Sequence, residues 1–294
     1  MTEKTNNNLI NGIAADFLHI NDRAIHYGDG LFETILCYNN QLCYWQEHFQ
    51  RLFSSAKKLQ IVCPEEHVLL QDIDKLLAEQ DNARQHVYAI KIILSRGLSE
   101  RGYKFTKKIR ANRIVSLSMI DAAYSSLVTK QLLSGDLFLC EQQASINENL
   151  AGLKHLNRLE NVLARNEWAD TRSTSTIIDG LMLNANQYII EGTMSNVFAV
   201  KNKTLYTPDL MYSGINGIMR DVIMASAIQA NIITSIVNVT LNDFLAMDEV
   251  FICNSLIGIK SVNNLLNSSY QQKEITESIF YSLLSSMDRH THHV

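Results

Sequence analysis

Lys154 lies in an otherwise apolar stretch, LAGLKHL at residues 150–156, next to a glycine-containing turn. Burial disfavours a charged ammonium group, so a lysine in such surroundings can become a neutral nucleophile. Most lysines are nevertheless solvated surface residues. Lys154 is therefore a candidate for covalent chemistry only if the chain also provides partner groups.

Two other segments provide such groups. Glu191 follows the apolar residues 188–190 and begins the sequence EGTMSN, and a solvated edge-strand glutamate explains it as well as a ligand-binding carboxylate does. The sequence GINGIMRD at 214–221 is a glycine-rich turn that opens a helix. The free amides and the dipole of a helix start favour a phosphate, and an ordinary helix start is the alternative. The motif GDG at 28–30 is better explained by a tight turn.

An amine, a carboxylate and an anion-binding helix start are together what an enzyme dependent on pyridoxal 5'-phosphate requires. The cofactor needs a covalent anchor, a partner for its pyridine nitrogen and a cradle for its phosphate. The usual hydrolase and kinase signatures, G-x-S-x-G, G-x-x-x-x-G-K-[ST], H-E-x-x-H and G-x-G-x-x-G, do not occur in the sequence.

The elements that must position these groups come as strands and helices in groups, not in strict alternation, which predicts an α+β fold. In the first 120 residues we expect two strands around an Asn-Asn turn at 36–45, helices at 46–61 and 67–80, and strands at 86–97 and 113–120. Further on we expect a strand at 136–143, a helix at 156–169, a meander of short strands up to Pro208, a helix from 218 to about 230, a strand at 249–255 and a helix at 275–287.

The small, polar segment 121–130 is the candidate linker. It predicts a smaller N-terminal α/β domain at 1–120 and a larger, sheet-rich C-terminal domain at 131–294. The tail from residue 287 contains three histidines, and we expect it to be frayed and without function.

Composition narrows the class of partner. The 294 residues are 46% hydrophobic and 19% charged with a net charge of −4, which provides no basic surface for nucleic acid or anionic lipid. The five cysteines are scattered, so we expect reduced thiols and no zinc site or other metal site. There is no apolar run of 18 residues and no basic, apolar leader. We therefore expect a cytoplasmic protein with a small-molecule substrate, not a membrane protein.

Seven motifs, in order along nearly the whole chain, resemble those of the fold type IV pyridoxal phosphate enzymes. This family includes branched-chain aminotransferases, D-amino acid aminotransferases and 4-amino-4-deoxychorismate lyases. The motifs are NDRAIHYGDGLFETI (21–35), EHFQRL (47–52), ILSRGLSERGY (93–103), LAGLKHLNRLENVLAR (150–165), EGTMSNVF (191–198), GINGIMR (214–220) and DEVFICNS (248–255). The resemblance implies a two-domain α+β fold like that of D-amino acid aminotransferases, and a homodimer.

The resemblance also implies roles for individual residues. Lys154 is expected to carry the cofactor as an internal aldimine and then to act as the general base, and Glu191 to face the pyridine nitrogen. The expected phosphate ligands are Arg51, the backbone amides of Ile218 and Met219, and the hydroxyl of Ser255.

Within the family, SRGLSERGY and LAGLKHLNRLE look most like the lyases. Leu159 stands where branched-chain aminotransferases have a tyrosine that bonds the cofactor's phenolic oxygen. The partner of that oxygen therefore stays open, with Asn157 as a candidate. The resemblance implies Arg101, Tyr103 and Phe32 as substrate-binding residues.

Arg96 lies nearer the strand than Arg101, and we expect it to be structural. The expected reaction is the elimination that converts 4-amino-4-deoxychorismate into 4-aminobenzoate and pyruvate in folate biosynthesis. The resemblance therefore implies a carbon–oxygen lyase. The alternative is a D-amino acid or branched-chain aminotransferase of the same fold.

Overall fold

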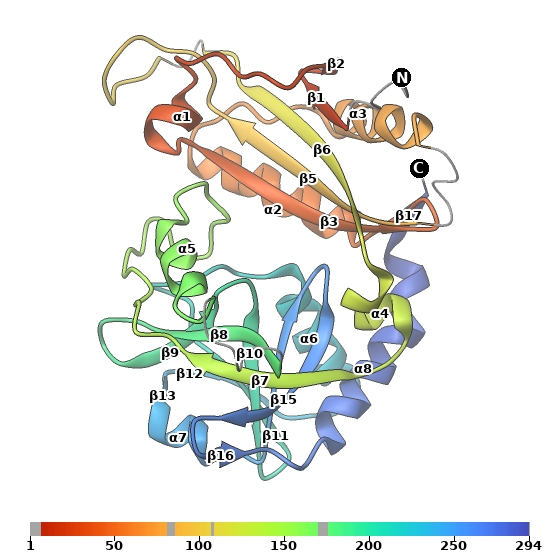
Figure 1. Cartoon of the computed structure of the whole chain (residues 1–294), viewed down its shortest axis with the longest axis vertical. Helices are drawn as coiled ribbons and strands as arrows, with labels where there is room; N and C mark the ends of the chain where they lie inside the picture. Colours follow the sequence, from red (N-terminus) through yellow and green to blue (C-terminus); the bar gives the residue numbers. More distant parts are fainter. Residues whose placement is uncertain (1–6, 81–85, 107–108, 170–175, 294) are drawn as a thin grey trace. The chain divides into compact units, whose positions relative to one another are not determined.

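The computed structural model describes residues 7–80, 86–106, 109–169 and 176–293 (Figure 1). The chain divides into two compact units. The first takes in residues 1–124, 154–157 and 288–294, and the second takes in residues 125–153 and 158–287. Each unit combines helices with a sheet of mostly antiparallel strands, so the predicted α+β class is confirmed.

The first unit is built on a seven-stranded sheet of order β17-β4-β3-β5-β6-β1-β2, in which all neighbours are antiparallel. Its strands are β1 Asn8–Ile10, β2 Ile13–Ala14, β3 Gly30–Tyr38, β4 Gln41–Cys43, β5 Val87–Ser95, β6 Asn112–Ile120 and β17 Thr291–His293. Its helices are α1 Arg23–Tyr27, α2 Trp45–Lys58 and α3 Glu66–Ala78.

The hairpin of β3 and β4 follows from local chemistry. Asn39 and Asn40 have φ angles of 54° and 57°, the left-handed region that a two-residue turn between antiparallel strands requires. The predicted Asn-Asn turn is thus confirmed. The short strand β4 follows it, and α2 begins two residues after β4 ends.

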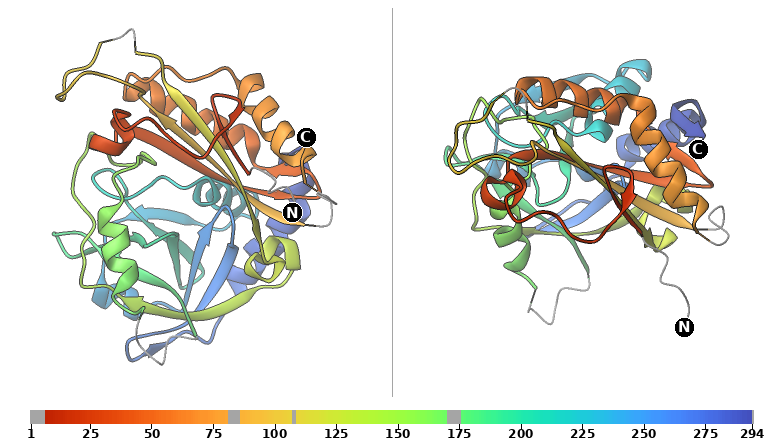
Figure 2. Two further views of the ribbon diagram at one scale, coloured as in Figure 1. Left: turned by 45° about the horizontal axis from the view of Figure 1, so that its top comes forward. Right: turned by 90° about the horizontal axis from the view of Figure 1, so that it is seen from above.

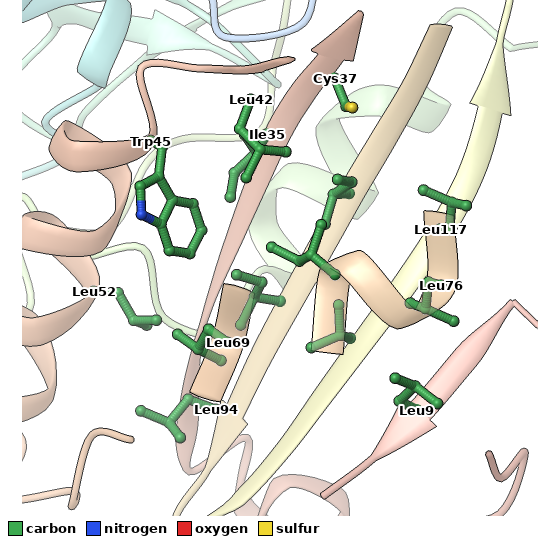
Figure 3. Close-up of a cluster of buried hydrophobic side chains, with 14 of the residues drawn as sticks. Leu9, Ile35, Cys37, Leu42, Trp45, Leu52, Leu69, Leu76, Leu94 and Leu117 are labelled. Atoms are coloured by element: carbon green, nitrogen blue, oxygen red, sulfur yellow. The ribbon is translucent and has the colours of Figure 1, made fainter. Parts of the chain in front are cut away.

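The core of this unit lies between one face of the sheet and the helices α2 and α3, which cover that face (Figures 1 and 2). Figure 3 shows Trp45 and Leu52 of α2 directed at the strands that carry Ile35 and Leu94. Trp45, Leu52 and Ala56 are buried at positions that share one face of the helix, which is why α2 packs with this face inward.

The second unit is built on a ten-stranded sheet of order β12-β11-β10-β14-β15-β7-β8-β9-β13, with β16 paired to β15. Its strands are β7 Leu133–Leu139, β8 Ile177–Leu183, β9 Tyr188–Gly192, β10 Asn196–Lys201, β11 Thr204–Pro208, β12 Thr234–Val237, β13 Val239–Thr240, β14 Glu249–Asn254, β15 Gly258–Leu265 and β16 Ser268–Ser269. Its helices are α4 Ser126–Thr129, α5 Leu159–Asn166, α6 Ile218–Gln229, α7 Leu241–Leu245 and α8 Glu274–Ser286. The helices α6 and α8 contact each other and β14.

The predicted linker contains regular structure. A 3-10 helix, Ala122–Tyr124, ends the N-terminal segment of the first unit, and α4 belongs to the second. The Ser126 hydroxyl donates to the backbone oxygen of Ile257 at 2.9 Å and accepts from the amide of Ile259 at 3.0 Å. These buried hydrogen bonds attach the second half of segment 121–130 to the start of β15 in the second unit.

The C-terminal tail is not frayed, and that expectation was wrong. Residues of β17 pair with β4, and the Tyr44 amide donates to the backbone oxygen of His290 at 2.7 Å. Without β17, backbone groups at the edge of β4 would be unpaired. Backbone hydrogen bonds to β4 therefore hold this short strand in place, although its sequence has no apolar periodicity. The first unit therefore contains both ends of the described chain.

Among the described residues, no helix has both the length and the apolar character needed to cross a lipid bilayer.

Candidate active site

Lys154 lies in a short extended segment and not on the helix that follows it. Its backbone oxygen accepts a hydrogen bond from the amide of Phe32 at 2.9 Å, and the amide of Leu156 donates to Gly30 at 3.0 Å. An isolated bridge between Leu31 and His155 completes this pairing with the start of β3. Because these backbone groups bond to β3, the helix predicted from residue 156 begins only at Leu159.

The side chain of Lys154 is half-buried and its amine lies over an aromatic ring. Nζ of Lys154 is 4.2 Å from the centroid of the Phe32 ring, and Nζ of Lys91 is 5.3 Å from the same centroid. The Phe32 ring thus provides an apolar, π-electron-rich surface for the Lys154 amine. Phe32 therefore contacts Lys154 through both its backbone and its side chain.

Arg51 is held in a buried ion pair within the same unit. Its Nε donates to Oε1 of Glu33 at 2.8 Å and its Nη2 donates to Oε2 at 2.5 Å. Nδ1 of His48 lies 2.6 Å from the same Oε2. Glu33 and His48 are each 1% exposed, so the pair is withdrawn from water. Arg51 was expected from the sequence, whereas Glu33 and His48, the two residues that hold it, were not.

Asn157 holds a turn. Its Nδ2 donates to the backbone oxygen of Gly28 at 3.0 Å, and a Cβ placed on Gly28 would lie 2.6 Å from the Asn157 Oδ1. Gly28 has φ 59° and ends α1, in agreement with the tight-turn interpretation of GDG. A role for Asn157 at the cofactor's phenolic oxygen stays a prediction.

Arg101 and Tyr103 are exposed on the segment after β5, with Tyr103 84% exposed. The Tyr103 ring lies 5.3 Å from that of Tyr27, and the Tyr103 backbone oxygen accepts from Arg23 at 3.1 Å. Their contact with substrate stays a prediction.

Arg96 is structural, as expected. It is buried, and its guanidinium donates to both carboxylate oxygens of Asp29 at 2.7 and 2.9 Å and to the backbone oxygens of Leu59 and Gln60. The Phe105 ring covers its other side, with the centroid 3.7 Å from Cζ. The described contacts of Arg96 are all with groups of the protein.

In the second unit, Glu191 is a buried carboxylate with a fixed orientation. It is 4% exposed on β9, and its Oε2 accepts the amide of Ile215 at 2.8 Å. The guanidinium of Arg158 lies close enough to act on it: burial lowers the pKa of Arg158, and the Glu191 charge opposes that change. A neighbouring guanidinium stabilises the ionised form of a carboxylate. Arg158 was missed from the sequence, where it is one of several charges in KHLNRLE.

A second buried acid organises the turn that follows Glu191. Asp179 of β8 accepts hydrogen bonds from the hydroxyls of Thr193 and Ser195 at 2.5 and 2.6 Å, and from the amide of Met194 at 3.2 Å. It is 2% exposed. In the sequence, Asp179 is followed by Gly180, a pair typical of turns, and nothing local marks Asp179 as a residue that shapes the site.

At the start of α6, the glycine N-cap lets other groups come close to the backbone. Gly217 is the N-cap and makes no side-chain cap hydrogen bond, so the first amides of the helix, those of Ile218 and Met219, are not capped by a side chain. A Cβ on Gly217 would lie only 2.0 Å from Oδ1 of Asn196, whose Nδ2 donates to the backbone oxygen of Ile215 at 2.9 Å. A larger residue here would have to displace the Asn196 side chain from its hydrogen bond to Ile215.

Two further contacts bring the predicted groups of this unit together. Gly152 donates to the backbone oxygen of Gly214 and accepts from the amide of Asn216, which ties the segment before Lys154 to the glycine-rich turn. Asn254, next to Ser255, donates to the backbone oxygen of Met194 at 3.1 Å. The turns after β9, before α6 and after β14 therefore form one connected structure.

Comparisons with known proteins identify the family of this chain. The family described as amino-transferase class IV matches residues 30–265. The chain is 33% identical over 256 residues to an aminodeoxychorismate lyase of Vibrio harveyi, which covers 87% of this chain and 90% of that protein. It is 27% identical over 248 residues to a D-alanine aminotransferase of Listeria innocua, with 84% and 81% covered.

Among solved structures, the 4-amino-4-deoxychorismate lyase of Pseudomonas aeruginosa matches with a TM-score of 0.84 and 31% identity, over 96% of this chain and 99% of that one. The fold thus occurs in a known class of enzyme. The chain belongs to the class IV aminotransferase family, whose members have the fold type IV architecture, as predicted.

Proposed function

We propose that this protein is a pyridoxal 5'-phosphate-dependent lyase that converts 4-amino-4-deoxychorismate into 4-aminobenzoate and pyruvate. The observation that carries the proposal is the half-buried amine of Lys154 over the Phe32 ring in a chain more similar to the Vibrio lyase, at 33%, than to the Listeria aminotransferase, at 27%. Leu159 supports it, because an aliphatic side chain 70% exposed cannot donate the hydrogen bond that a tyrosine provides in branched-chain aminotransferases.

The residues present fit pyridoxal phosphate. The start of α6 lacks a side-chain cap and excludes a Cβ at Gly217, which suits a phosphate held by backbone amides. Glu191 is a buried carboxylate beside a guanidinium, which suits a protonated pyridine nitrogen. The proposed ligands are Lys154, Glu191, Arg51, Asn157, Ser255 and the amides of Ile218 and Met219.

When bound, the cofactor supplies an electron sink for the charge that develops on the amine-bearing ring carbon of the substrate. Lys154 is the proposed base that takes the proton from that carbon, and its position beside Phe32 keeps the amine in an apolar environment. Glu191 holds the proton on the pyridine nitrogen. The ring C–O bond breaks, the ring becomes aromatic, and the proton held by Lys154 passes to the released enolpyruvate to give pyruvate. Because aromatisation makes the elimination effectively one-way, no second substrate is needed. Arg101 and Tyr103 are the proposed contacts for the substrate's carboxylates.

The same proposal includes a homodimer that works in the cytoplasm. Its support is the similarity to the class IV family and a composition with scattered free cysteines and a net charge of −4.

The decisive experiment supplies purified protein with 4-amino-4-deoxychorismate alone, and in parallel with D-alanine or branched-chain amino acids plus 2-oxoglutarate. We expect 4-aminobenzoate and pyruvate to form in equal amounts with no oxo acid present. Amino transfer to 2-oxoglutarate without any aromatic product would overturn the lyase and establish an aminotransferase.

A further inference from the structure

Glu33, His48 and Arg51 form a buried polar cluster, here named the Glu33 cluster, at the junction of β3 and α2. The carboxylate of Glu33 receives Nε and Nη2 of Arg51 at 2.8 and 2.5 Å, and Nδ1 of His48 lies 2.6 Å from Oε2. The exposed fraction of each side chain is 12% for Arg51 and 2% or less for the other two. Three polar side chains thus occupy space next to an apolar core.

The protonation states in this cluster are well defined. Burial raises the pKa of Glu33, but the Arg51 charge and the hydrogen bond from His48 outweigh it and lower that pKa to about 2. Burial lowers the pKa of His48, and the charges of Arg51 and Lys154 act in the same direction against the opposing effect of Glu33. At neutral pH the cluster therefore contains a carboxylate, a guanidinium and a neutral imidazole whose Nδ1–H donates to Glu33.

The pairing determines which edge of the guanidinium is directed elsewhere. A guanidinium has five N–H groups in one plane, and Glu33 engages the edge made by Nε and Nη2. The remaining N–H groups form the second edge, which is the geometry that binds a phosphate through two parallel hydrogen bonds. Glu33 lies on β3 and is held by His48, so its ion pair with Arg51 restricts the guanidinium, and with it the second edge, to one orientation.

A stabilising role alone does not account for the cluster. Replacing a buried ion pair by apolar side chains is often neutral or favourable for stability. Among the described residues, Nε2 of His48 is also buried and lacks a hydrogen-bond partner, which is a further cost. Lys154 lies within electrostatic range of His48, so the cluster adjoins the residue proposed to carry the chemistry.

We propose that Glu33 is a positioning residue that orients the guanidinium of Arg51 for the phosphate of the cofactor, with His48 bracing Glu33. The inference rests on the proposed function, in which Arg51 is a phosphate ligand. Glutamine at position 33 cannot perform the same task, because its amide nitrogen would meet an N–H group of Arg51 as a second donor.

The test compares two probes that differ only in the phosphate, pyridoxal 5'-phosphate and pyridoxal. Purified enzyme is stripped of cofactor and titrated with each probe, for the unaltered protein and for Glu33→Gln. We expect Glu33→Gln to weaken binding of pyridoxal phosphate by about 10- to 100-fold, the loss of an oriented charge-assisted hydrogen bond. Binding of pyridoxal should change less than about threefold, since it makes no use of that bond.

Asp72→Asn is the matched control. Asp72 of α3 pairs with Nε of Arg113 on β6 at 2.6 Å, a buried carboxylate–guanidinium pair between a helix and a strand of the same unit. We expect this variant to lower thermal stability and to leave the ratio of the two affinities unchanged. An equal loss for both probes in Glu33→Gln would show that Glu33 only supports the fold and would overturn the inference.

His48 provides a second pair of variants if Glu33→Gln does not fold. His48→Gln keeps a side-chain donor and should retain the affinity ratio, whereas His48→Leu should reduce it. If the unaltered protein does not prefer pyridoxal phosphate to pyridoxal, the proposed cofactor site itself fails. If it does and the preference persists in Glu33→Gln and His48→Leu, only the role of Glu33 fails.

Discussion

At the scale of single residues, Lys154 and Lys91 offer a direct comparison. Both amines lie near the Phe32 ring, at 4.2 and 5.3 Å from its centroid, but only Lys154 follows the glycine turn of residues 150–153. Lys91 is therefore a matched control for Lys154, because it shares the ring but not the turn.

Lys154→Ala should abolish the visible absorbance of bound cofactor and reduce turnover by more than about a thousandfold, because it removes the covalent anchor and the base together. Lys91→Ala should retain both. Absorbance spectra and 4-aminobenzoate release measure the two effects. A yellow and active Lys154→Ala protein would refute the assignment.

Glu191→Ala should lower turnover more than cofactor affinity, by about 100-fold against less than tenfold, because the carboxylate stabilises charge that develops during the reaction. Glu249→Ala is a suitable control: it removes another buried carboxylate of the second unit, which accepts the amides of Ile275 and Thr276 at the start of α8. That variant should lose stability and retain turnover per folded molecule. Unchanged turnover in Glu191→Ala would contradict the role of the glutamate.

At the scale of elements, the start of α6 depends on one missing side chain. A Cβ at Gly217 would meet the side-chain oxygen of Asn196, so any larger residue must displace that side chain, which is hydrogen-bonded to Ile215, or shift the helix start. Asp179 has the complementary task of holding the turn between β9 and β10, from which Asn196 extends.

Gly217→Ala should therefore weaken binding of pyridoxal 5'-phosphate by about tenfold or more, since a shift of the first amides by a fraction of an ångström disrupts their hydrogen bonds to a phosphate. Equilibrium titration with pyridoxal 5'-phosphate and with pyridoxal measures this effect. We expect pyridoxal to bind as before, and an equal loss for both ligands would indicate general damage to the second unit.

At the scale of the whole molecule, the Glu33 cluster predicts how stability depends on pH. The pKa of Glu33 is lowered from 4.5 to about 2 on folding, so its contribution is complete above pH 4.5 and is lost as pH falls towards 2. The pKa of His48 is also lowered on folding, so the unfolded chain gains a proton below about pH 6.5 that folded His48 does not bind. Both groups make the protein acid-sensitive.

We expect the free energy of unfolding to decline gently below pH 6.5 and steeply below pH 4.5, with the carboxylate accounting for on the order of 3 kcal/mol. Denaturant unfolding at several pH values, for the unaltered protein and Glu33→Gln, measures the difference. The variant should be less stable at pH 7 and should lose less on acidification. Parallel pH profiles for the two proteins would contradict the assigned protonation of Glu33.

The sequence by itself determined the family and the α+β class, because these depend on local patterns. Periodicity places α2, the pair Asn39-Asn40 places the hairpin, and short motifs at fixed spacing make Lys154 and Glu191 the proposed reactive groups. Each of these patterns can be recognised from a few neighbouring residues.

Only the tertiary structure decided what surrounds those groups. Segment 154–156 pairs with β3 instead of continuing into α5, and β17 returns to the edge of β4, since unpaired backbone groups there find partners far away in the sequence. Glu33 and Asp179 were invisible as site residues for the same reason. The importance of a buried carboxylate depends on the donors that reach it, and those donors come from other elements of the fold.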